Sequence, residues 1–129
     1  MSAPTQLFLY GTLRRGAPMH GLVEGHARYV GPAETDGRLV DLGAFPALVA
    51  EGAPGERVKG DLFEIHAGEA ARLLDVLDRY EGARFRRERV TVRGPAGPVD
   101  AWVYRFTGDA SAARVVEGGD YLAARSVRA

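Results

Sequence analysis

Cysteine is absent from the 129-residue sequence, lysine occurs once, and the 17 basic and 17 acidic side chains leave no formal net charge. Without cysteine the chain has no disulfide, thiolate metal site or cysteine nucleophile. A neutral chain also lacks the summed basic field on which nucleic-acid and anionic-membrane binding rely. No apolar run approaches the length of a membrane span, and no signal-peptide pattern is present. We therefore expect a soluble, cytoplasmic protein without a nucleic-acid or membrane partner.

Several common catalytic patterns are missing as well. The sequence has no G-x-S-x-G elbow, no G-x-x-x-x-G-K-[ST] phosphate loop, no G-x-G-x-x-G dinucleotide motif and no H-E-x-x-H zinc motif. The three histidines show no metal-ligand spacing, and we expect them in loops or on the surface: His20, His26 and His66. We expect no metal site, and any reaction here would use a nucleophile that belongs to the substrate and would need only proton transfer and oxyanion stabilisation.

Short apolar stretches recur about every ten residues, which is typical of strands. We expect strands over 7–10, 27–30, 38–42, 47–50, 58–65, 85–93 and 99–106, with a hairpin turn over 94–98. Neither alternate face of 58–65 is cleanly polar, which indicates a closed or covered sheet. One helix is expected over 69–81, with Gly82 as its C-terminal cap. Near the end of the chain, the turn at 118–120 is expected to lead into a short terminal helix or an ordered end. The pattern predicts an α+β (mixed α/β) fold, a small mixed β-barrel with one main helix, in a single domain over residues 1–129.

The strand expected over 7–10 stops at Gly11 and is followed by the basic residues Arg14 and Arg15. Glycine lets the backbone turn, or approach a ligand where a side chain would clash. Amide groups exposed at such a turn can bind an anion or a developing oxyanion. A strand that ends in Gly-Thr is most often ordinary turn chemistry, however. This stretch becomes a candidate site only if a second element points to the same place.

Glu81 is such an element. At about 100° per residue, positions 70, 74, 77 and 81 lie within a narrow arc, so the Glu81 carboxylate continues the apolar stripe of the helix. Burial and the negative end of the helix dipole both raise the pKa of a carboxyl group, toward the range useful for a general acid/base. The alternative is that the last turn frays and that Glu81 reaches solvent or pairs with Arg84 or Arg86.

Both candidates lie in motifs that can be compared with known families. The first motif is Tyr10-Gly11-Thr12-Leu13-Arg14, and the second is the L-D-R-Y-E-G stretch at 77–82. They resemble the Y-G-[ST]-L-[RK] signature and the L-D-x-x-E-G segment of the gamma-glutamylcyclotransferase-like family. Further similar stretches follow in the family's order at 37–46, 58–63 and 102–104, so the resemblance covers nearly the whole chain, from about residue 7 to residue 121.

The resemblance implies a mixed barrel and a reaction in which the α-amine of a gamma-glutamyl group attacks its own γ-carbonyl. The products are 5-oxoproline and the released amine or amino acid. Glu81 matches the family's base, which moves a proton from the α-ammonium to the leaving nitrogen. Tyr10, Gly11, Thr12 and Leu13 match the loop that holds the glutamyl head, largely through backbone groups. The implied partner is a small gamma-glutamyl molecule, and ring closure needs orientation and proton transfer rather than a cofactor.

Three further positions bear on the same pocket: Arg14, Phe85 and Tyr104. Arg14 is the nearest cation in sequence to this loop and is our candidate for binding the substrate carboxylate. Many family members have tyrosine four residues after the glutamate, where this chain has Phe85. Tyr104 would supply a hydroxyl from the opposite wall, although Tyr104 and Trp102 are more often core aromatics. Phe85 also supports the alternative of a non-catalytic module that binds a small anionic metabolite or a protein segment in the same pocket.

A local basic cluster follows the helix, and no motif indicates an oligomeric state. The pleat of the expected strand divides the cluster between two faces, and Glu88 interrupts it, so we expect a solvated surface. Its members are Arg84, Arg86, Arg87 and Arg89.

Overall fold

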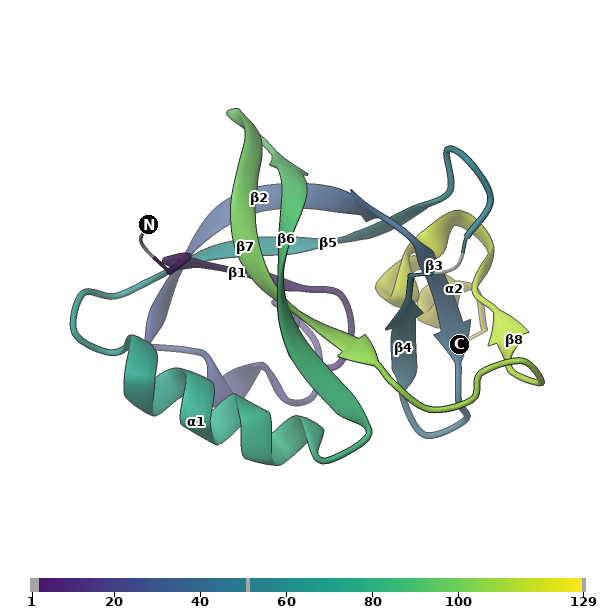
Figure 1. Ribbon diagram of the computed structural model, residues 1–129, viewed down its shortest axis with the longest axis horizontal. Coiled ribbons are helices and arrows are strands. Elements are labelled where there is room, and N and C mark those ends of the chain that lie inside the picture. The colour runs from purple at the N-terminus through teal and green to yellow at the C-terminus, as the bar shows by residue number, and fades with distance from the viewer. Residues whose placement is uncertain (1–2, 51, 129) are drawn as a thin grey trace.

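The chain is organised around a β-sheet that closes on itself, in a computed structural model that describes residues 3–50 and 52–128 (Figure 1). Within those residues the strands are β1 (Gln6–Leu9), β2 (Ala27–Asp36), β3 (Arg38–Asp41), β4 (Pro46–Val49), β5 (Arg57–Ile65), β6 (Phe85–Gly94), β7 (Gly97–Phe106) and β8 (Arg114–Val115). Strands β1, β5, β2, β6 and β7 are neighbours in that order, and β1 also pairs in parallel with β7, where Leu7 lies opposite Trp102. This pairing closes a five-stranded barrel, so the predicted fold is confirmed.

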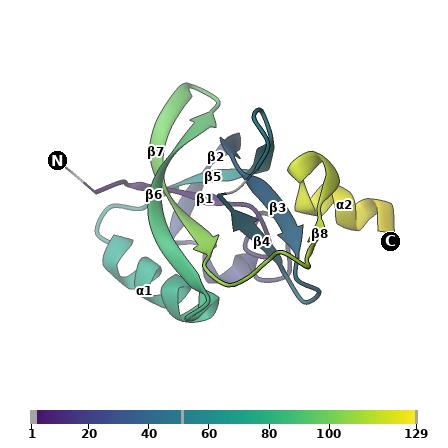
Figure 2. The same cartoon turned by 45° about the vertical axis from the view of Figure 1, so that its right-hand side comes forward.

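The remaining strands extend the sheet beyond the barrel. Strand β4 runs parallel to β7, with Leu48 opposite Arg105, and β3 pairs antiparallel with both β4 and β8. The 3-10 turn η2 (Glu117–Gly119) and helix α2 (Tyr121–Arg128) follow β8 and lie on the side away from the main helix (Figure 2). Of the two alternatives expected after the turn at 118–120, the structure has the short helix. Strand β8 was not predicted, because a two-residue strand carries no alternating pattern.

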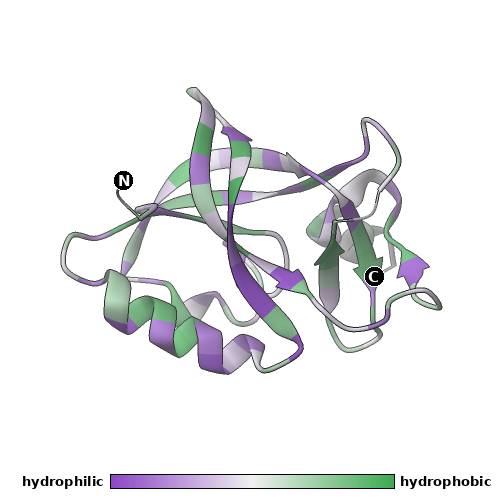
Figure 3. Cartoon of the chain, in the orientation of Figure 1, coloured by the Kyte–Doolittle hydropathy of each residue, from purple (hydrophilic) through white to green (hydrophobic). Residues whose placement is uncertain are grey.

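Helix α1 (Ala70–Glu81) runs along the barrel on the other side, and the 3-10 turn η1 (His20–Leu22) lies in the loop between β1 and β2 (Figure 1). Polar and apolar patches alternate along α1 (Figure 3), and the buried side chains are Leu73, Leu74 and Leu77. Gly82 ends the helix with a φ of 80°, and its amide donates to the Asp78 carbonyl, as predicted for a C-terminal cap. In the described part of the chain, no helix is both long and apolar enough to cross a membrane.

Strand β1 is buried on both faces because its alternate side chains enter two different cores. Phe8 and, just past the strand, Tyr10 belong to the core inside the barrel. Leu7 and Leu9 belong to a second core, which packs beneath α1. Each fully buried side chain of this kind contributes roughly 1.5–3 kcal/mol to folding. The end of β1 is therefore fixed where the barrel interior and the helix meet.

Two strand ends differ from the prediction because glycine and proline were read as breaks. Strand β2 continues through Gly31, where its pairing with β5 shifts by one residue and the backbone φ is 156°. A β-carbon there would collide with the ring of Pro95, so glycine is needed inside the strand. The hairpin between β6 and β7 is also tighter than predicted, since pairing continues to Gly94 opposite Gly97.

Candidate active site

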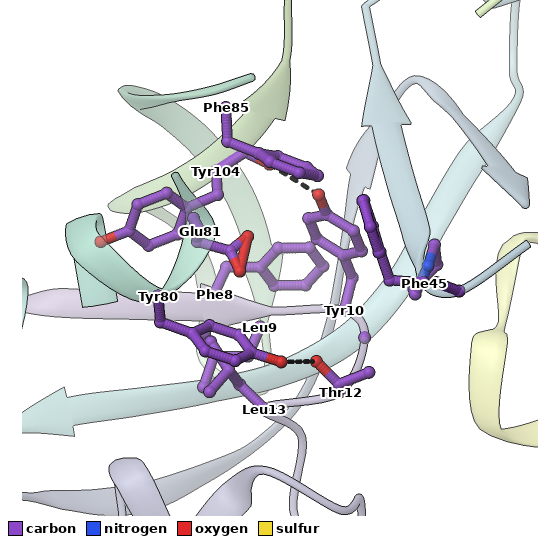
Figure 4. A pocket seen from close by; sticks show the side chains of 13 residues that line it. Phe8, Leu9, Tyr10, Thr12, Leu13, Phe45, Tyr80, Glu81, Phe85 and Tyr104 are labelled. Carbon is purple, nitrogen blue, oxygen red and sulfur yellow. Dashed lines mark hydrogen bonds between the residues drawn. The ribbon is translucent and has the colours of Figure 1, made fainter. Parts of the chain in front are cut away.

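A pocket opens where the end of β1, the loop between β3 and β4, and the end of α1 meet (Figure 4). Its volume is about 240 Å³. The lining residues are Phe8, Leu9, Tyr10, Gly11, Thr12, Leu13, Ala44, Phe45, Pro46, Tyr80, Glu81, Phe85 and Tyr104. Glu81 is the only charged residue among these described residues, so a single carboxylate faces an apolar and aromatic wall. A small concave site with few polar groups is typical of small-molecule binding.

The Tyr10 hydroxyl fixes the end of β1 to two other strands. It donates a hydrogen bond to the Tyr104 carbonyl oxygen at 2.7 Å and accepts one from the Leu48 amide at 3.1 Å. Tyr10 is 6% exposed, and burial raises the pKa of its phenol well above the usual range. The hydroxyl therefore stays protonated, and it holds the following turn in place against β7 and β4.

Gly11 is required by the close approach of Pro46, the first residue of β4. A β-carbon at Gly11 would lie 2.7 Å from Pro46 Cγ, closer than real β-carbons come to other atoms. The backbone at Gly11 does not have a positive φ. The absence of a side chain therefore serves the packing of β4 against the turn, rather than a left-handed backbone conformation.

In the turn after β1, three backbone amides have no hydrogen-bond acceptor within the described part of the protein, and we call them open amides. The carbonyl oxygens of Gly11 and Thr12 accept hydrogen bonds from the Arg14 and Met19 amides, at 3.1 and 2.8 Å. Across residues 3–50 and 52–128, no protein acceptor receives a hydrogen bond from the amides of Gly11, Thr12 or Leu13. All three residues line the pocket. They can therefore offer donors to a carboxylate or an oxyanion of a bound ligand.

Glu81 is the last residue of α1, and its carboxylate points into the pocket (Figure 4). Burial raises the pKa of this carboxyl group from 4.5 to about 7. Within the described residues the carboxylate has no hydrogen-bond or ion-pair partner, and Arg86 instead lies 3.9 Å from Glu88. The alternative in which Glu81 pairs with Arg84 or Arg86 is therefore wrong. A carboxyl group that titrates near neutral pH can both accept and donate a proton.

Tyr104 lines the pocket with its ring, but its hydroxyl points away from it (Figure 4). The hydroxyl donates a hydrogen bond of 2.6 Å to Asp78 Oδ1, and Arg87 Nε donates to the same oxygen at 2.8 Å. Burial, together with the bond to Asp78, raises the pKa of the Tyr104 phenol above its usual range. The hydroxyl that we expected Tyr104 to offer to a substrate is instead part of the contact between β7 and α1.

Arg14 lies outside the set of residues that line the pocket. Its guanidinium lies 2.9 Å from Asp120 Oδ1 and 3.3 Å from Asp61 Oδ1, and its side chain is 12% exposed. Asp61 also accepts a hydrogen bond of 2.9 Å from the Arg15 amide. This position does not support the predicted binding of a substrate carboxylate. Arg14 ties the turn after β1 to β5 and to the residue that precedes α2.

Sequence reasoning missed two prominent aromatic residues of the pocket. The Tyr80 hydroxyl lies 2.7 Å from the Thr12 hydroxyl and joins α1 to the turn. Tyr80 occupies an unspecified position of the L-D-x-x-E-G segment, so no pattern singled it out. Phe45 packs its ring 5.7 Å from that of Phe85. The only signal for Phe45 was its place in the stretch 37–46, which resembles the family.

None of the three histidines lines this pocket. His26 Nδ1 lies 2.7 Å from Glu69 Oε1, His20 Nδ1 lies 3.0 Å from the Leu13 carbonyl oxygen, and His66 is exposed. Among the described residues, no group of three or more histidine, aspartate or glutamate side chains could hold a metal ion.

The sequence model of the family described as "Gamma-glutamyl cyclotransferase, AIG2-like" matches residues 7–123. The chain belongs to this family. The matched range contains both the turn after β1 and the end of α1, the two segments that supply the open amides and the carboxylate of the pocket. The resemblance of the motifs at 10–14 and 77–82 to the gamma-glutamylcyclotransferase-like family is thereby confirmed.

Several members of the gamma-glutamyl cyclotransferase, AIG2-like family can be compared directly. The chain is 31% identical over 112 residues to the gamma-glutamylaminecyclotransferase of Bos taurus, covering 76% of this chain and 63% of that protein. It is 30% identical over 109 residues to the gamma-L-glutamyl-butirosin B gamma-glutamyl cyclotransferase of Niallia circulans, covering 80% and 67%. The crystal structure of a mouse AIG2-like protein superimposes with a TM-score of 0.76 at 24% identity, covering 93% of this chain and 89% of that one. The matched part of the chain thus spans about two thirds of these two curated relatives, and the mouse structure has the same fold.

Proposed function

We propose that this family member is a gamma-glutamylcyclotransferase-type enzyme. It cyclises the gamma-glutamyl group of a small amine or peptide to 5-oxoproline and releases the amine or amino acid. Family membership supports a cyclotransferase-type function, and the names of two relatives specify gamma-glutamylamine and gamma-L-glutamyl-butirosin B as what those proteins act on. One observation carries the proposal: the unpaired Glu81 carboxylate shares a small pocket with the open amides of the turn after β1.

Glu81 would move the protons of this reaction. Its carboxylate takes a proton from the α-ammonium of the substrate, which frees the lone pair that attacks the γ-carbonyl carbon. One carbon–nitrogen bond forms in the five-membered ring, and the bond from the same carbon to the leaving nitrogen breaks. Protonated Glu81 gives a proton to that nitrogen and returns to the carboxylate. The attacking nitrogen loses a second proton when it becomes the amide nitrogen of the ring. The released amine takes up one proton as it becomes an ammonium, so the protons balance.

The amides of Gly11, Thr12 and Leu13 would bind the negative charges of the substrate, which the Glu81 carboxylate cannot bind. Attack on the carbonyl carbon places negative charge on its oxygen, and preorganised amide donors lower the energy of that oxyanion. The α-carboxylate of the glutamyl head is a second acceptor for the same set of donors. The apolar lining limits water, which strengthens these interactions. Because the nucleophile and the leaving group belong to one substrate, orientation supplies much of the remaining rate.

A non-catalytic binding module that uses the same pocket is the second candidate. The observation in its favour is Phe85, which stands where many family members have tyrosine. Its ring lies 5.7 Å from that of Phe45 and 5.5 Å from that of Phe106, so this wall offers no hydroxyl to a substrate.

The test is release of 5-oxoproline by the purified protein from a panel of gamma-glutamyl peptides and gamma-glutamyl amines. We expect release from at least one compound, and a loss of about 100-fold or more in Glu81→Gln, since general acid/base groups typically contribute that much. Glu69→Gln is the matched control, because Glu69 lies at the opposite end of α1 and pairs with His26. Full activity in Glu81→Gln contradicts the proposed role. Ligand-induced thermal stabilisation without product, unaffected by Glu81→Gln, identifies the binding module instead.

A further inference from the structure

Arg84 differs from its neighbours in the basic cluster because no carboxylate pairs with it. The other three lie within 4 Å of an acidic partner: Arg86 with Glu88, Arg87 with Asp78, and Arg89 with Asp100. Arg84 lies in the loop between α1 and β6, and in the described part of the chain its side chain makes no ion pair or hydrogen bond. Arg84 is exposed, which agrees with the expected solvated surface, and it keeps a positive charge that no carboxylate compensates.

The Arg84 guanidinium is held against the aromatic wall of the pocket. Its Cζ lies 5.3 Å from the centroid of the Phe45 ring and 5.9 Å from that of Phe106. Phe45 and Phe85 line the cavity and pack against each other. A cation over the face of an aromatic ring is attracted by the ring quadrupole, which restrains a side chain that is otherwise exposed. Arg84 is not itself among the residues that line the cavity, but Phe45, whose ring it contacts, is one of them, so positive charge lies next to the apolar wall of the pocket.

The pocket itself offers little to a positively charged leaving group. Glu81 is the only acidic side chain among its described lining residues, and the proposed reaction uses that carboxylate for proton transfer. A second ammonium on the substrate would therefore lack a counter-charge inside the pocket and would be repelled by Arg84. Specificity arises from such unfavourable pairings as much as from favourable ones.

Resting on the proposed function, we propose that Arg84 selects the leaving group, and that the substrates are gamma-glutamyl peptides whose second residue is apolar or aromatic. The carboxylate of that residue is one carbon from the leaving nitrogen and pairs with Arg84. Its side chain packs against the rings of Phe45 and Phe85. The same bond changes as above then release a free apolar amino acid together with 5-oxoproline.

Two substrates that differ only in the carboxylate test this assignment. Gamma-glutamyl-phenylalanine has the carboxylate, and gamma-glutamyl-phenethylamide lacks it while keeping the aromatic ring and the scissile bond. We expect kcat/KM of the wild type to be about tenfold higher for the peptide, the ratio given by about 1.4 kcal/mol of ion pairing. Gamma-glutamyl-putrescine, which carries a second ammonium, should be the poorest of the three.

Arg84→Met removes the charge but keeps an unbranched side chain that can still cover the Phe45 ring. Arg84 is exposed, and its carbonyl contact to Thr107 is a backbone one, so the variant should fold. We expect it to lose rate only with the peptide, which brings the ratio of the two kcat/KM values close to one. Arg86→Met is the matched control and should leave the ratio unchanged.

The possible results separate this inference from the proposed function. Equal wild-type rates for the peptide and the amide, an unchanged ratio in Arg84→Met, or a preference for gamma-glutamyl-putrescine each overturn the role of Arg84 and leave a cyclotransferase in place. If none of these compounds, nor any other member of the gamma-glutamyl panel, yields 5-oxoproline, the proposed function itself fails.

Discussion

The hydroxyls of Tyr80 and Thr12 lie 2.7 Å apart and join the last turn of α1 to the turn after β1. Tyr80 immediately precedes Glu81, and Thr12 carries one of the open amides. Together with the core that Leu13 shares with Leu77, this contact fixes the spacing between the two halves of the pocket, the carboxylate on the helix and the amide donors on the turn. Tyr80 is 37% exposed, so the contact contributes more to the geometry of the pocket than to the stability of the fold.

Tyr80→Phe should lower activity with little loss of stability. Removing a partly exposed hydrogen bond costs about 1 kcal/mol or less of unfolding free energy. Because one of the contacts that fix the spacing between Glu81 and the amides is lost, we expect kcat to fall about three- to tenfold, as small misplacements of reacting groups are costly. Steady-state release of 5-oxoproline and urea unfolding measure the two effects.

Substitutions at Thr12 provide the control for this prediction. Thr12→Ser keeps the hydroxyl and should retain activity, whereas Thr12→Val removes it and should resemble Tyr80→Phe. In the double variant Tyr80→Phe/Thr12→Val the losses should not add, because both changes break one interaction. Strictly additive losses would show that the two hydroxyls act independently.

Much of the fold was predictable because its signals are local. The helix over 69–81 follows from the spacing of Leu73, Leu74 and Leu77, and most strands follow from short alternating runs. The closure of the barrel depends on Leu7 lying opposite Trp102, a contact between distant segments that leaves no periodic trace in the sequence. The length of β2 was missed for the opposite reason. Gly31 locally indicated the end of the strand, but β2 continues through it, and the glycine is needed because Pro95 packs where a side chain would lie.

The residues of the candidate site also differ in whether a local sequence signal marks them. Glu81 was found because a carboxylate interrupts a local apolar stripe, and Gly11 because it ends a local strand pattern. Tyr80 was not predicted as a site residue, because its hydrogen-bond partner Thr12 is 68 positions away in the sequence. Arg14 was placed near the substrate on sequence proximity alone, whereas its partner Asp120 lies 106 positions along the chain. The role of a residue whose partner is distant in the sequence can be inferred only from the three-dimensional structure.

Gly11→Ala should disturb the turn while leaving the barrel intact. The added methyl group would lie 2.7 Å from Pro46 Cγ, so either the turn or the start of β4 must move. Overpacking of this kind costs about 1–3 kcal/mol, and the displaced amides should lower kcat/KM by tenfold or more. Circular dichroism checks the fold and 5-oxoproline release the rate.

Pro46→Ala provides the rescue for Gly11→Ala, because it removes the ring atoms that the methyl group meets. We expect the double variant to recover part of the lost activity. A double variant that is as inactive as Gly11→Ala would mean that the backbone of the turn, rather than this contact, requires glycine.

Arg14→Met should destabilise the fold, since it leaves Asp61 without its cation. Asp61 is 6% exposed, and breaking a buried ion pair by removing one partner costs several kcal/mol, here about 2–4 because the Arg15 amide still donates to Asp61. Arg79→Met is the control. Its pair with Asp75 is exposed on both sides, so its loss should cost under about 0.5 kcal/mol. Urea unfolding measures both, and equal effects of the two substitutions would contradict a structural role for Arg14.

The pH dependence of activity should report the ionisation of Glu81. Burial raises the pKa of this carboxyl group to about 7, and the proposed base must be ionised to take a proton from the substrate. We therefore expect kcat/KM to rise with pH through about 7 and then to level off. A profile that is flat between pH 5 and 8 would show that no group with this pKa limits the reaction.

The same pKa shift predicts that ionised Glu81 destabilises the folded protein. Its pKa is about 7 when folded and close to its ordinary 4.5 when unfolded, so between these values the folded chain holds a proton that the unfolded chain releases. The contribution of Glu81 to stability is therefore complete below about pH 4.5 and is lost as pH rises through 7. Glu81→Gln cannot ionise, so it should exceed the wild type in unfolding free energy by about 3 kcal/mol at pH 8, from about 1.4 kcal/mol per pKa unit, and nearly match it at pH 4.5. Glu69, whose hydrogen bond to His26 lowers its pKa, gives the opposite trend, with Glu69→Gln less stable than the wild type at neutral pH. Urea unfolding across this pH range measures both differences, and a Glu81→Gln difference that does not change with pH would mean that the carboxylate is solvated rather than buried.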